Sequence, residues 1–255
     1  MQIIDTHLHL YAEEYAADRK ALIAAAKSDG VARLLLPNID SSSVEGLKAL
    51  AAEYPDYCLP MMGLHPCYVK DNFEEELALV EKELRTGNYI AVGEIGMDKY
   101  WELDHLPQQE EALRRQLRWA HELDLPVALH TRNANDEVIA IIRELNLPGL
   151  RGVFHCFSGT VEQANEMIQL GFYLGIGGVL TYKNGGLDKI ITEIPLEHLV
   201  LETDGPYLSP VPFRGKRNLP AYIRYVAEKL AGIKNQTLHR VADITTENAR
   251  RLFRI

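Results

Sequence analysis

The sequence of 255 residues has few cysteines and lacks a long apolar run. Its three cysteines, Cys58, Cys67 and Cys156, form neither an even set nor a C-x-x-C pair, which argues against a disulfide-stabilised secreted domain. No stretch approaches the roughly 18 apolar residues of a membrane span, and the chain begins with an apolar strand pattern rather than a basic leader. We therefore expect a cytoplasmic protein that does not enter a membrane.

Basic charge is also scarce, because 27 Lys and Arg stand against 36 Asp and Glu, for a net charge of −9. This balance argues against a protein that coats duplex nucleic acid, although an enzyme that takes in one strand end remains compatible with it. Low-complexity tracts and linkers are missing too, and the composition is ordinary for a globular enzyme. We expect one domain over residues 1–255 and, without a clear apolar surface stripe, a monomer.

Strand-like runs alternate with helical patterns along the chain. Eight runs are predicted as strands, at residues 2–8, 32–38, 57–66, 89–96, 126–132, 151–157, 172–178 and 198–204. Parallel strands need long crossovers and bury both faces, so this order predicts an α/β fold, a TIM (β/α)8 barrel. A doubly wound open sheet is the alternative, but a glycine-rich phosphate loop after the first strand is missing. The helical tail from about Leu219 to Ile255 is expected to pack outside the barrel.

The opening stretch IIDTHLHL places two histidines one residue apart in a predicted strand. Successive side chains of a strand point to opposite faces, so His7 and His9 point the same way, together with Asp5. This pair indicates half of a metal site, but two hydrogen-bonded histidines at a strand end would give the same motif. The residues at the ends of the other predicted strands distinguish these two interpretations.

Ionisable side chains recur at the carboxyl ends of the predicted strands, and in a TIM barrel these ends converge on one mouth. Any one of these histidines is most simply a structural residue, but five histidines with two carboxylates indicate a shared site. Imidazole and carboxylate suit Zn²⁺, Mn²⁺ and related ions. The residues are His7, His9, His65, Glu94, His130, His155 and Asp204.

Two divalent ions bridged by one carboxylate fit this pattern, because the shared charge reduces the repulsion between the ions. Such a pair lowers the pKa of a bound water and stabilises the attacking and leaving oxygens of a phosphodiester. The expected nucleophile is a metal-bound hydroxide, with Asp204 as the general base. The ligand types do not identify the metal among Zn²⁺, Mn²⁺, Mg²⁺, Ni²⁺ and Fe²⁺. The assigned ligands are Glu94 as the bridge, His7, His9 and Asp204 at one ion, and His130 with His155 at the other.

Seven motifs, IIDTHLHL, GLHP, GEIGMD, PVALHTR, HCFSG, LETDGPYL and RGKRNLP, resemble in order and spacing the TatD-type metal-dependent deoxyribonucleases of the amidohydrolase superfamily. The resemblance covers nearly the whole chain and implies a TIM barrel, the same six ligands and, for many members, 3′→5′ exonuclease activity on DNA. Two positions depart from the family pattern, since Tyr11 stands where Asp or Asn is usual and Gly205 where Ala is usual. Neither is a ligand.

Further residues are candidates for supporting roles. Glu202 shares a strand face with Asp204, so it can orient a histidine ligand, bind a further ion or serve as a buried structural carboxylate. His65 is interpreted as a contact to a substrate phosphate, with a hydrogen-bonded loop histidine as the alternative. Arg132 and Arg217 are candidate phosphate contacts, and a solvated basic patch with Arg214 and Lys216 is the alternative for the loop. The aromatic residues near the same rim that are candidates to stack on unpaired bases are Tyr100, Trp101, Tyr182 and Tyr207.

The leading hypothesis is thus a phosphodiesterase that acts on single-stranded DNA ends with two divalent metals. An amidohydrolase-type enzyme for a small phosphoester, amide or lactone would carry the same ligands. A catalytically inactive barrel kept as a scaffold is a third possibility, but such a protein has no physical need for so many converging histidines.

Overall fold

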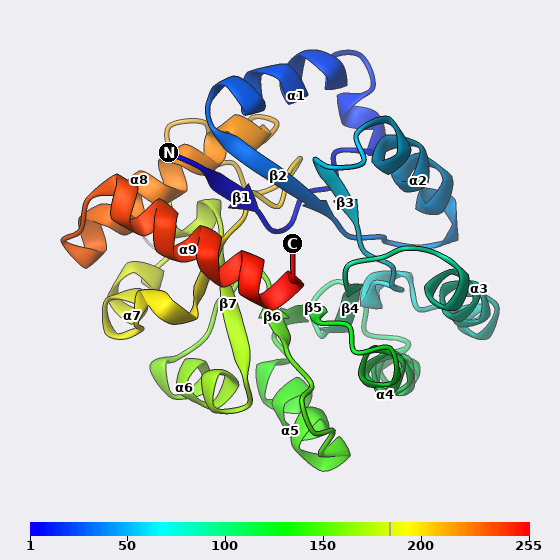
Figure 1. The fold of residues 1–255 in the computed structure, drawn as a ribbon. Coiled ribbons are helices and arrows are strands. Elements are labelled where there is room, and N and C mark those ends of the chain that lie inside the picture. The colour runs from blue at the N-terminus through cyan, green and yellow to red at the C-terminus, as the bar shows by residue number, and fades with distance from the viewer. Residues whose placement is uncertain (184) are drawn as a thin grey trace.

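The structure is a computed structural model that describes residues 1–183 and 185–255. Parallel strands alternate with helices along the chain, and α1 to α7 follow β1 to β7 in turn (Figure 1). The strands are β1 (Ile3–Asp5), β2 (Val31–Leu36), β3 (Cys58–Pro60), β4 (Val92–Asp98), β5 (Val127–Arg132), β6 (Gly152–Phe154), β7 (Phe172–Ile176) and β8 (Leu199–Leu201). All eight predicted strands are present, although each is shorter than its apolar run.

Apart from the last one, the helices form an outer layer around the strands (Figure 1). They are α1 (Arg19–Ser28), α2 (Val44–Glu53), α3 (Phe73–Thr86), α4 (Leu106–Glu122), α5 (Asn135–Leu145), α6 (Val161–Gln169), α7 (Leu187–Glu193), α8 (Ile223–Lys234) and α9 (Leu238–Phe253). Gly30 and Gly171, which follow α1 and α6, both have positive φ values, 87° and 90°. Glycine suits these two helix ends because it adopts the left-handed conformation without steric cost.

Backbone hydrogen bonds join the strands in two runs, β1 to β3 and β4 to β8. At one edge Met62 pairs with Val92 in a parallel bridge, and at the other Leu8 pairs with Gly205. The amide of Thr6 also donates to the carbonyl of Leu201, at 3.0 Å. These links bring the two runs together at both edges, which confirms the predicted TIM barrel and excludes the open doubly wound sheet.

The C-terminal tail is helical as predicted, but α9 takes a different position from the one expected. Its residues Ala249, Leu252 and Phe253 are buried against side chains from inside the barrel, and the C-terminus lies over the centre of the ring (Figure 1). The amino ends of the strands would otherwise leave apolar side chains exposed, and the apolar face of α9 covers them. The inner side chains of this cluster are Ile4, Leu35, Met61, Ala91, Ala128, Val153 and Val200.

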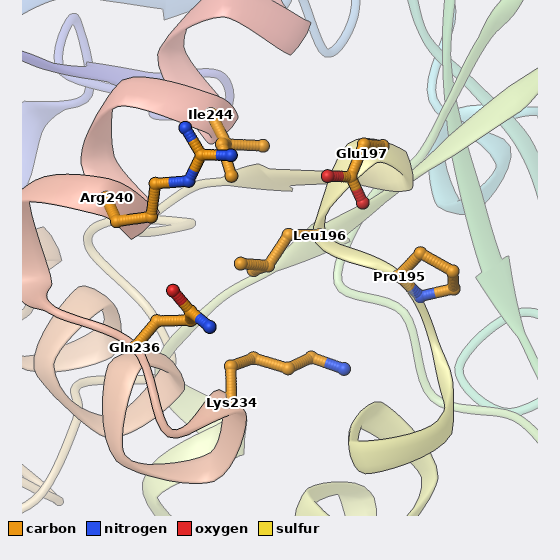
Figure 2. Close-up of a pocket in the computed structure, with 7 residues that line it drawn as sticks. All are labelled: Pro195, Leu196, Glu197, Lys234, Gln236, Arg240 and Ile244. Carbon is orange, nitrogen blue, oxygen red and sulfur yellow. The ribbon is translucent and has the colours of Figure 1, made fainter.

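A surface depression of about 270 Å³ lies beside α9, next to the chain segment that enters β8 (Figure 2). Its one lysine, Lys234, already donates to the backbone carbonyls of Ile191, Thr192 and Ile194. Because the lining residues Pro195, Leu196 and Glu197 precede β8, the depression lies at the amino end of the barrel. It is thus away from the mouth where the ionisable residues were predicted to meet. It is lined by Pro195, Leu196, Glu197, Lys234, Gln236, Arg240 and Ile244.

Among the described residues, no helix is long and apolar enough to cross a membrane.

Candidate metal centre

The carboxylate of Glu94 is the centre of the cluster at the barrel mouth. Its side chain is buried, with 3% of its surface exposed, because it lies on the fully buried strand β4. One of its oxygens, Oε1, lies 2.9 Å from His155 Nε2, 3.0 Å from His130 Nδ1 and 3.2 Å from His65 Nε2. His130 lies in β5 and His155 directly follows β6, whereas His65 lies in the loop after β3, which ends at Pro60 rather than at residue 66 as predicted. Each places an imidazole nitrogen against the same oxygen atom.

The second oxygen, Oε2, faces the two histidines of the opening motif. It lies 3.1 Å from His7 Nε2 and 3.5 Å from His9 Nε2. Asp204 Oδ1 approaches the same nitrogens from the other side, at 4.0 Å from His7 and 3.9 Å from His9. Two ligand atoms that each lie about 2.0–2.2 Å from one ion are about 3 to 4 Å apart, so these spacings fit a shared cation.

The polar atoms of the cluster are not satisfied by the protein alone. His7 Nδ1, His155 Nδ1 and Glu202 Oε2 are buried and have no hydrogen-bond partner within residues 1–183 and 185–255. The two Nδ1 atoms are not the nitrogens that face Glu94, so a cation held by the Nε2 atoms would not contact them. Such a cation would instead offset the cost of burying the Glu94 carboxylate. Nitrogen and carboxylate oxygen donors are those that Zn²⁺, Mn²⁺ and Fe²⁺ accept. Among the described residues, three overlapping groups have ligand atoms within 4.8 Å of one another: His7–His155–Asp204, His7–His9–Glu94 and His65–Glu94–His130.

The electrostatics of the cluster favour the metal-binding protonation states of Glu94 and His7 but not of every ligand. Burial opposes protonation of His155 and His130, yet the neighbouring carboxylates raise the pKa of both rings, so a metal ion bound there competes with a proton. Burial opposes ionisation of Glu94, but the surrounding imidazoles, with His65 the largest contributor, hold its pKa well below the usual value. Burial, reinforced by His155, lowers the pKa of His7 to about 3. Glu94 is therefore an anion and His7 a neutral imidazole at pH 7, as ligation requires. Burial raises the pKa of Asp204 to about 6, although His155 opposes the rise.

Asp98 is a member of this site that the sequence reasoning missed. It is buried, its Oδ2 lies 2.9 Å from His130 Nε2, and its Oδ1 accepts the amides of Tyr100 and Trp101. A carboxylate on the far nitrogen of a ligating histidine fixes the ring and raises its basicity. The motif GEIGMD could have indicated the position of Asp98, because strand alternation places residues 94 and 98 on one face.

Glu202 is fully buried and lies behind another histidine of the cluster. Its Oε1 accepts the amide of Cys156 and is 3.5 Å from His155 Nδ1. This geometry favours the interpretation that Glu202 orients a histidine ligand, whereas binding of a further ion stays a prediction. Asp5 has a different role from the nearby ligands, because its carboxylate accepts the hydroxyl and the amide of Thr203 and so ties β1 to β8.

His65 also contacts Glu94, and its hydrogen bonds hold its ring in one tautomer. Its Nδ1 accepts the backbone amide of Cys67 at 3.0 Å, so that nitrogen carries the lone pair. Burial lowers the pKa of His65, which keeps the ring neutral. Its Nε2 must then carry the proton and donate to Glu94 Oε1. His65 therefore presents an N–H donor to the mouth rather than a free ligand nitrogen.

The two predicted phosphate-binding arginines have different surroundings. Arg132 is exposed, with its guanidinium 5.1 Å from the centre of the Tyr100 ring. Arg217 donates to both carboxylate oxygens of Asp18 and to the carbonyl of Glu14. The guanidinium of Arg217 is thus engaged within the protein, whereas that of Arg132 faces solvent.

The predicted aromatic rim contains several exposed side chains. Trp101 has 73% of its surface exposed, Tyr207 55% and Tyr100 51%. Tyr68 is a further exposed aromatic residue, which the sequence reasoning did not name, and it follows His65 by three positions. Tyr182 is less available, because its hydroxyl donates to the carbonyl of Ser209 and its ring carries the guanidinium of Arg214 at 4.5 Å.

Comparison with known proteins supports the same assignment. The model of the family described as "TatD related DNase" matches residues 4–254. A Bacillus subtilis protein named "Uncharacterized metal-dependent hydrolase YabD" is 40% identical over 254 residues, covering 99% of each chain. The "3'-5' ssDNA/RNA exonuclease TatD" of Yersinia pseudotuberculosis is 32% identical, covering 99% of this chain and all of the relative. The crystal structure of the Escherichia coli TatD homologue YjjV superposes with a TM-score of 0.93 at 30% identity, covering 99% and 98% of the two chains. The chain belongs to the TatD family of metal-dependent hydrolases.

Proposed function

We propose that this protein is a 3′→5′ exonuclease that acts on single-stranded DNA ends with two divalent metal ions. The observation that carries the proposal is the Glu94 carboxylate, which faces imidazole nitrogens with both of its oxygens. A carboxylate in that position is suited to bridge two cations. The name of the Yersinia relative, an exonuclease for single-stranded DNA and RNA, supports this choice of substrate.

The ligand sets follow from the two sides of Glu94. His7, His9 and Asp204 would hold one ion, and His130 with His155 the other. Two bound ions would acidify a water and stabilise charge on the phosphodiester oxygens. Their identity is open among Zn²⁺, Mn²⁺, Mg²⁺, Ni²⁺ and Fe²⁺, because all accept these donors to some degree.

The surrounding residues would then hold and move the reacting groups. The raised pKa of Asp204, about 6, suits a general base that accepts a proton near neutral pH. The Nε2–H of His65 would donate to a phosphate oxygen of the substrate, in place of its present contact with Glu94. Arg132 would contact a further phosphate. Arg217 is a weaker candidate, since contact with a substrate would compete with its ion pair to Asp18.

The exposed aromatic residues would select unpaired strands. A base stacked on an aromatic ring contributes about 1–3 kcal/mol regardless of its identity. Trp101, Tyr100 and Tyr207 are the candidates, because each leaves half or more of its surface exposed. Stacking on these rings would favour a flexible strand end over a closed duplex.

The test is nucleotide release from an end-labelled single-stranded oligonucleotide by metal-stripped protein, by protein resupplied with Mn²⁺, Mg²⁺ or Zn²⁺, and by the Asp204→Asn variant. Asp243→Asn, at the opposite end of the barrel, is the matched control. We expect metal-dependent shortening from the 3′ end that Asp204→Asn lacks and Asp243→Asn retains. If folded, metal-loaded protein releases no nucleotide, the choice of DNA is wrong.

A small phosphoester, amide or lactone is the second candidate substrate. The ion pair between Arg217 and Asp18 favours a small substrate, because a paired arginine leaves fewer cations at the rim to bind a long polyanion such as DNA. Hydrolysis of a small phosphodiester by the metal-loaded protein, with no activity on oligonucleotides, would support this alternative. A protein that is purified without chelators and binds no metal would instead support a scaffold role.

We further propose that the chain works as a single-domain monomer in the cytoplasm. Its three cysteines are all free, which suits a reducing compartment. Light scattering after size-exclusion chromatography tests the monomer, with 28.8 kDa as the expected mass.

A further inference from the structure

Tyr11 fills a position where the family pattern has Asp or Asn, and its hydroxyl contacts a proposed ligand. The phenol oxygen lies 3.0 Å from His9 Nδ1 and 2.6 Å from the carbonyl oxygen of Pro37. The two rings are perpendicular, with their centres 5.9 Å apart. Since Pro37 directly follows β2, the phenol links the imidazole to a fixed point of the barrel.

The direction of these two hydrogen bonds follows from the groups involved. A carbonyl oxygen only accepts, so the single proton of the phenol is donated to Pro37. The phenol oxygen must then accept from His9, which places the imidazole proton on Nδ1. A neutral imidazole has one N–H, so Nε2 of His9 holds the lone pair. That nitrogen faces Glu94 Oε2 at 3.5 Å and Asp204 Oδ1 at 3.9 Å.

His65 shows that the tautomer of the ring depends on the group that contacts Nδ1. Its Nδ1 accepts an amide, from Cys67, and its Nε2 therefore carries a proton toward the same carboxylate. Two histidines beside Glu94 are thus held in opposite tautomers by the group behind each ring. One presents a ligand nitrogen and the other a donor.

We propose that Tyr11 is a positioning residue that fixes His9 as an Nε2 ligand and thereby sets the affinity of the ion assigned to His7, His9 and Asp204. This inference rests on the proposed metal centre. Loss of a hydrogen-bond partner behind a ligating histidine typically weakens metal binding 10–100-fold. The hydroxyl of Tyr11 contacts His9 and Pro37 rather than His130 or His155, so the ion that those two histidines would hold is expected to keep its affinity.

The experiment is a calorimetric titration of metal-free protein with Zn²⁺, for the wild type, Tyr11→Phe and Tyr15→Phe. Tyr15→Phe is the matched control, because its hydroxyl also donates to a backbone carbonyl, that of Asn218, but contacts no imidazole. We expect Tyr11→Phe to lose 10–100-fold in affinity at one of two sites, and Tyr15→Phe to bind as the wild type does. In parallel, ¹⁵N NMR of histidine-labelled wild type reads the tautomer of His9 directly.

The outcomes separate the two proposals. A wild type that binds no Zn²⁺ overturns the metal centre and the role of Tyr11 with it. A wild type that binds two ions, with Tyr11→Phe binding both equally well, overturns the role of Tyr11 alone. A His9 proton on Nε2 in the metal-free wild type also overturns it, whatever the stability of the variants.

Discussion

Gly175, the fourth residue of β7, lies against the carboxylate that we propose orients His155. A Cβ atom at this position would meet Glu202 Oε2 at 2.3 Å, Glu202 Cδ at 2.8 Å and His155 Cα at 3.0 Å. Real Cβ contacts essentially never fall below 3.0 Å, so Gly175→Ala requires the carboxylate to retreat by about 0.7 Å. A shift of this size would weaken the contact of Oε1 with the Cys156 amide and disturb its approach to His155 Nδ1.

We expect Gly175→Ala to weaken binding of one ion by about 10–100-fold, which corresponds to about 1.4–2.7 kcal/mol. Overpacking in the core should also lower the free energy of unfolding by about 1–3 kcal/mol. Calorimetric titration with Zn²⁺ and a thermal melt of the metal-free protein measure the two effects separately.

Gly177→Ala is the matched control, because it adds the same methyl group beside the same carboxylate. Its Cβ would lie 3.6 Å from Glu202 Cγ, an ordinary contact, and the extended backbone at Gly177, with φ −114° and ψ −163°, suits alanine. Metal affinity should therefore stay at the wild-type value. Equal metal affinity in Gly175→Ala and Gly177→Ala would refute the view that Glu202 positions His155. Glu202→Gln, which keeps the acceptor but removes the charge, provides a second check if Gly175→Ala folds poorly.

Three further predictions concern other parts of the molecule. Trp101→Ala should raise KM for a single-stranded oligonucleotide about 5- to 150-fold without changing the melting temperature, whereas the neighbouring Leu103→Ala, also exposed, should leave KM unchanged. Arg132→Ala should make the slope of log binding constant against log salt concentration about 0.7 less steep for single strands, and Arg217→Ala should change that slope less because of Asp18. Leu252→Ala, at the amino end of the barrel, should lower the free energy of unfolding by about 2–5 kcal/mol in denaturant titrations while the Zn²⁺ stoichiometry stays unchanged.

Most of the fold could be predicted because the alternation of apolar runs and helical patterns fixes a parallel sheet with crossovers. The position of α9 could not, since an amphipathic pattern tells that one face is buried but not which surface covers it. Leu252 and Phe253 would show the same periodicity on the outside of the barrel as they do across its amino end.

The candidate site was predictable to a similar extent. Strand ends placed the histidines and Glu94 at one mouth, because all parallel strands end there. The direction of each N–H was hidden, since it depends on groups such as the amide of Cys67 and the phenol of Tyr11. The ion pair of Arg217 with Asp18 joins residues 199 positions apart, and local patterns contain no trace of such a contact.

Anomalous diffraction from crystals soaked in Mn²⁺ tests whether Glu94 bridges two metal ions. We predict two anomalous peaks, one beside Oε2 within reach of His7 and His9, and one beside Oε1 within reach of His130 and His155. A single peak away from Glu94, or none in protein that still hydrolyses its substrate, would show that Glu94 does not bridge two ions.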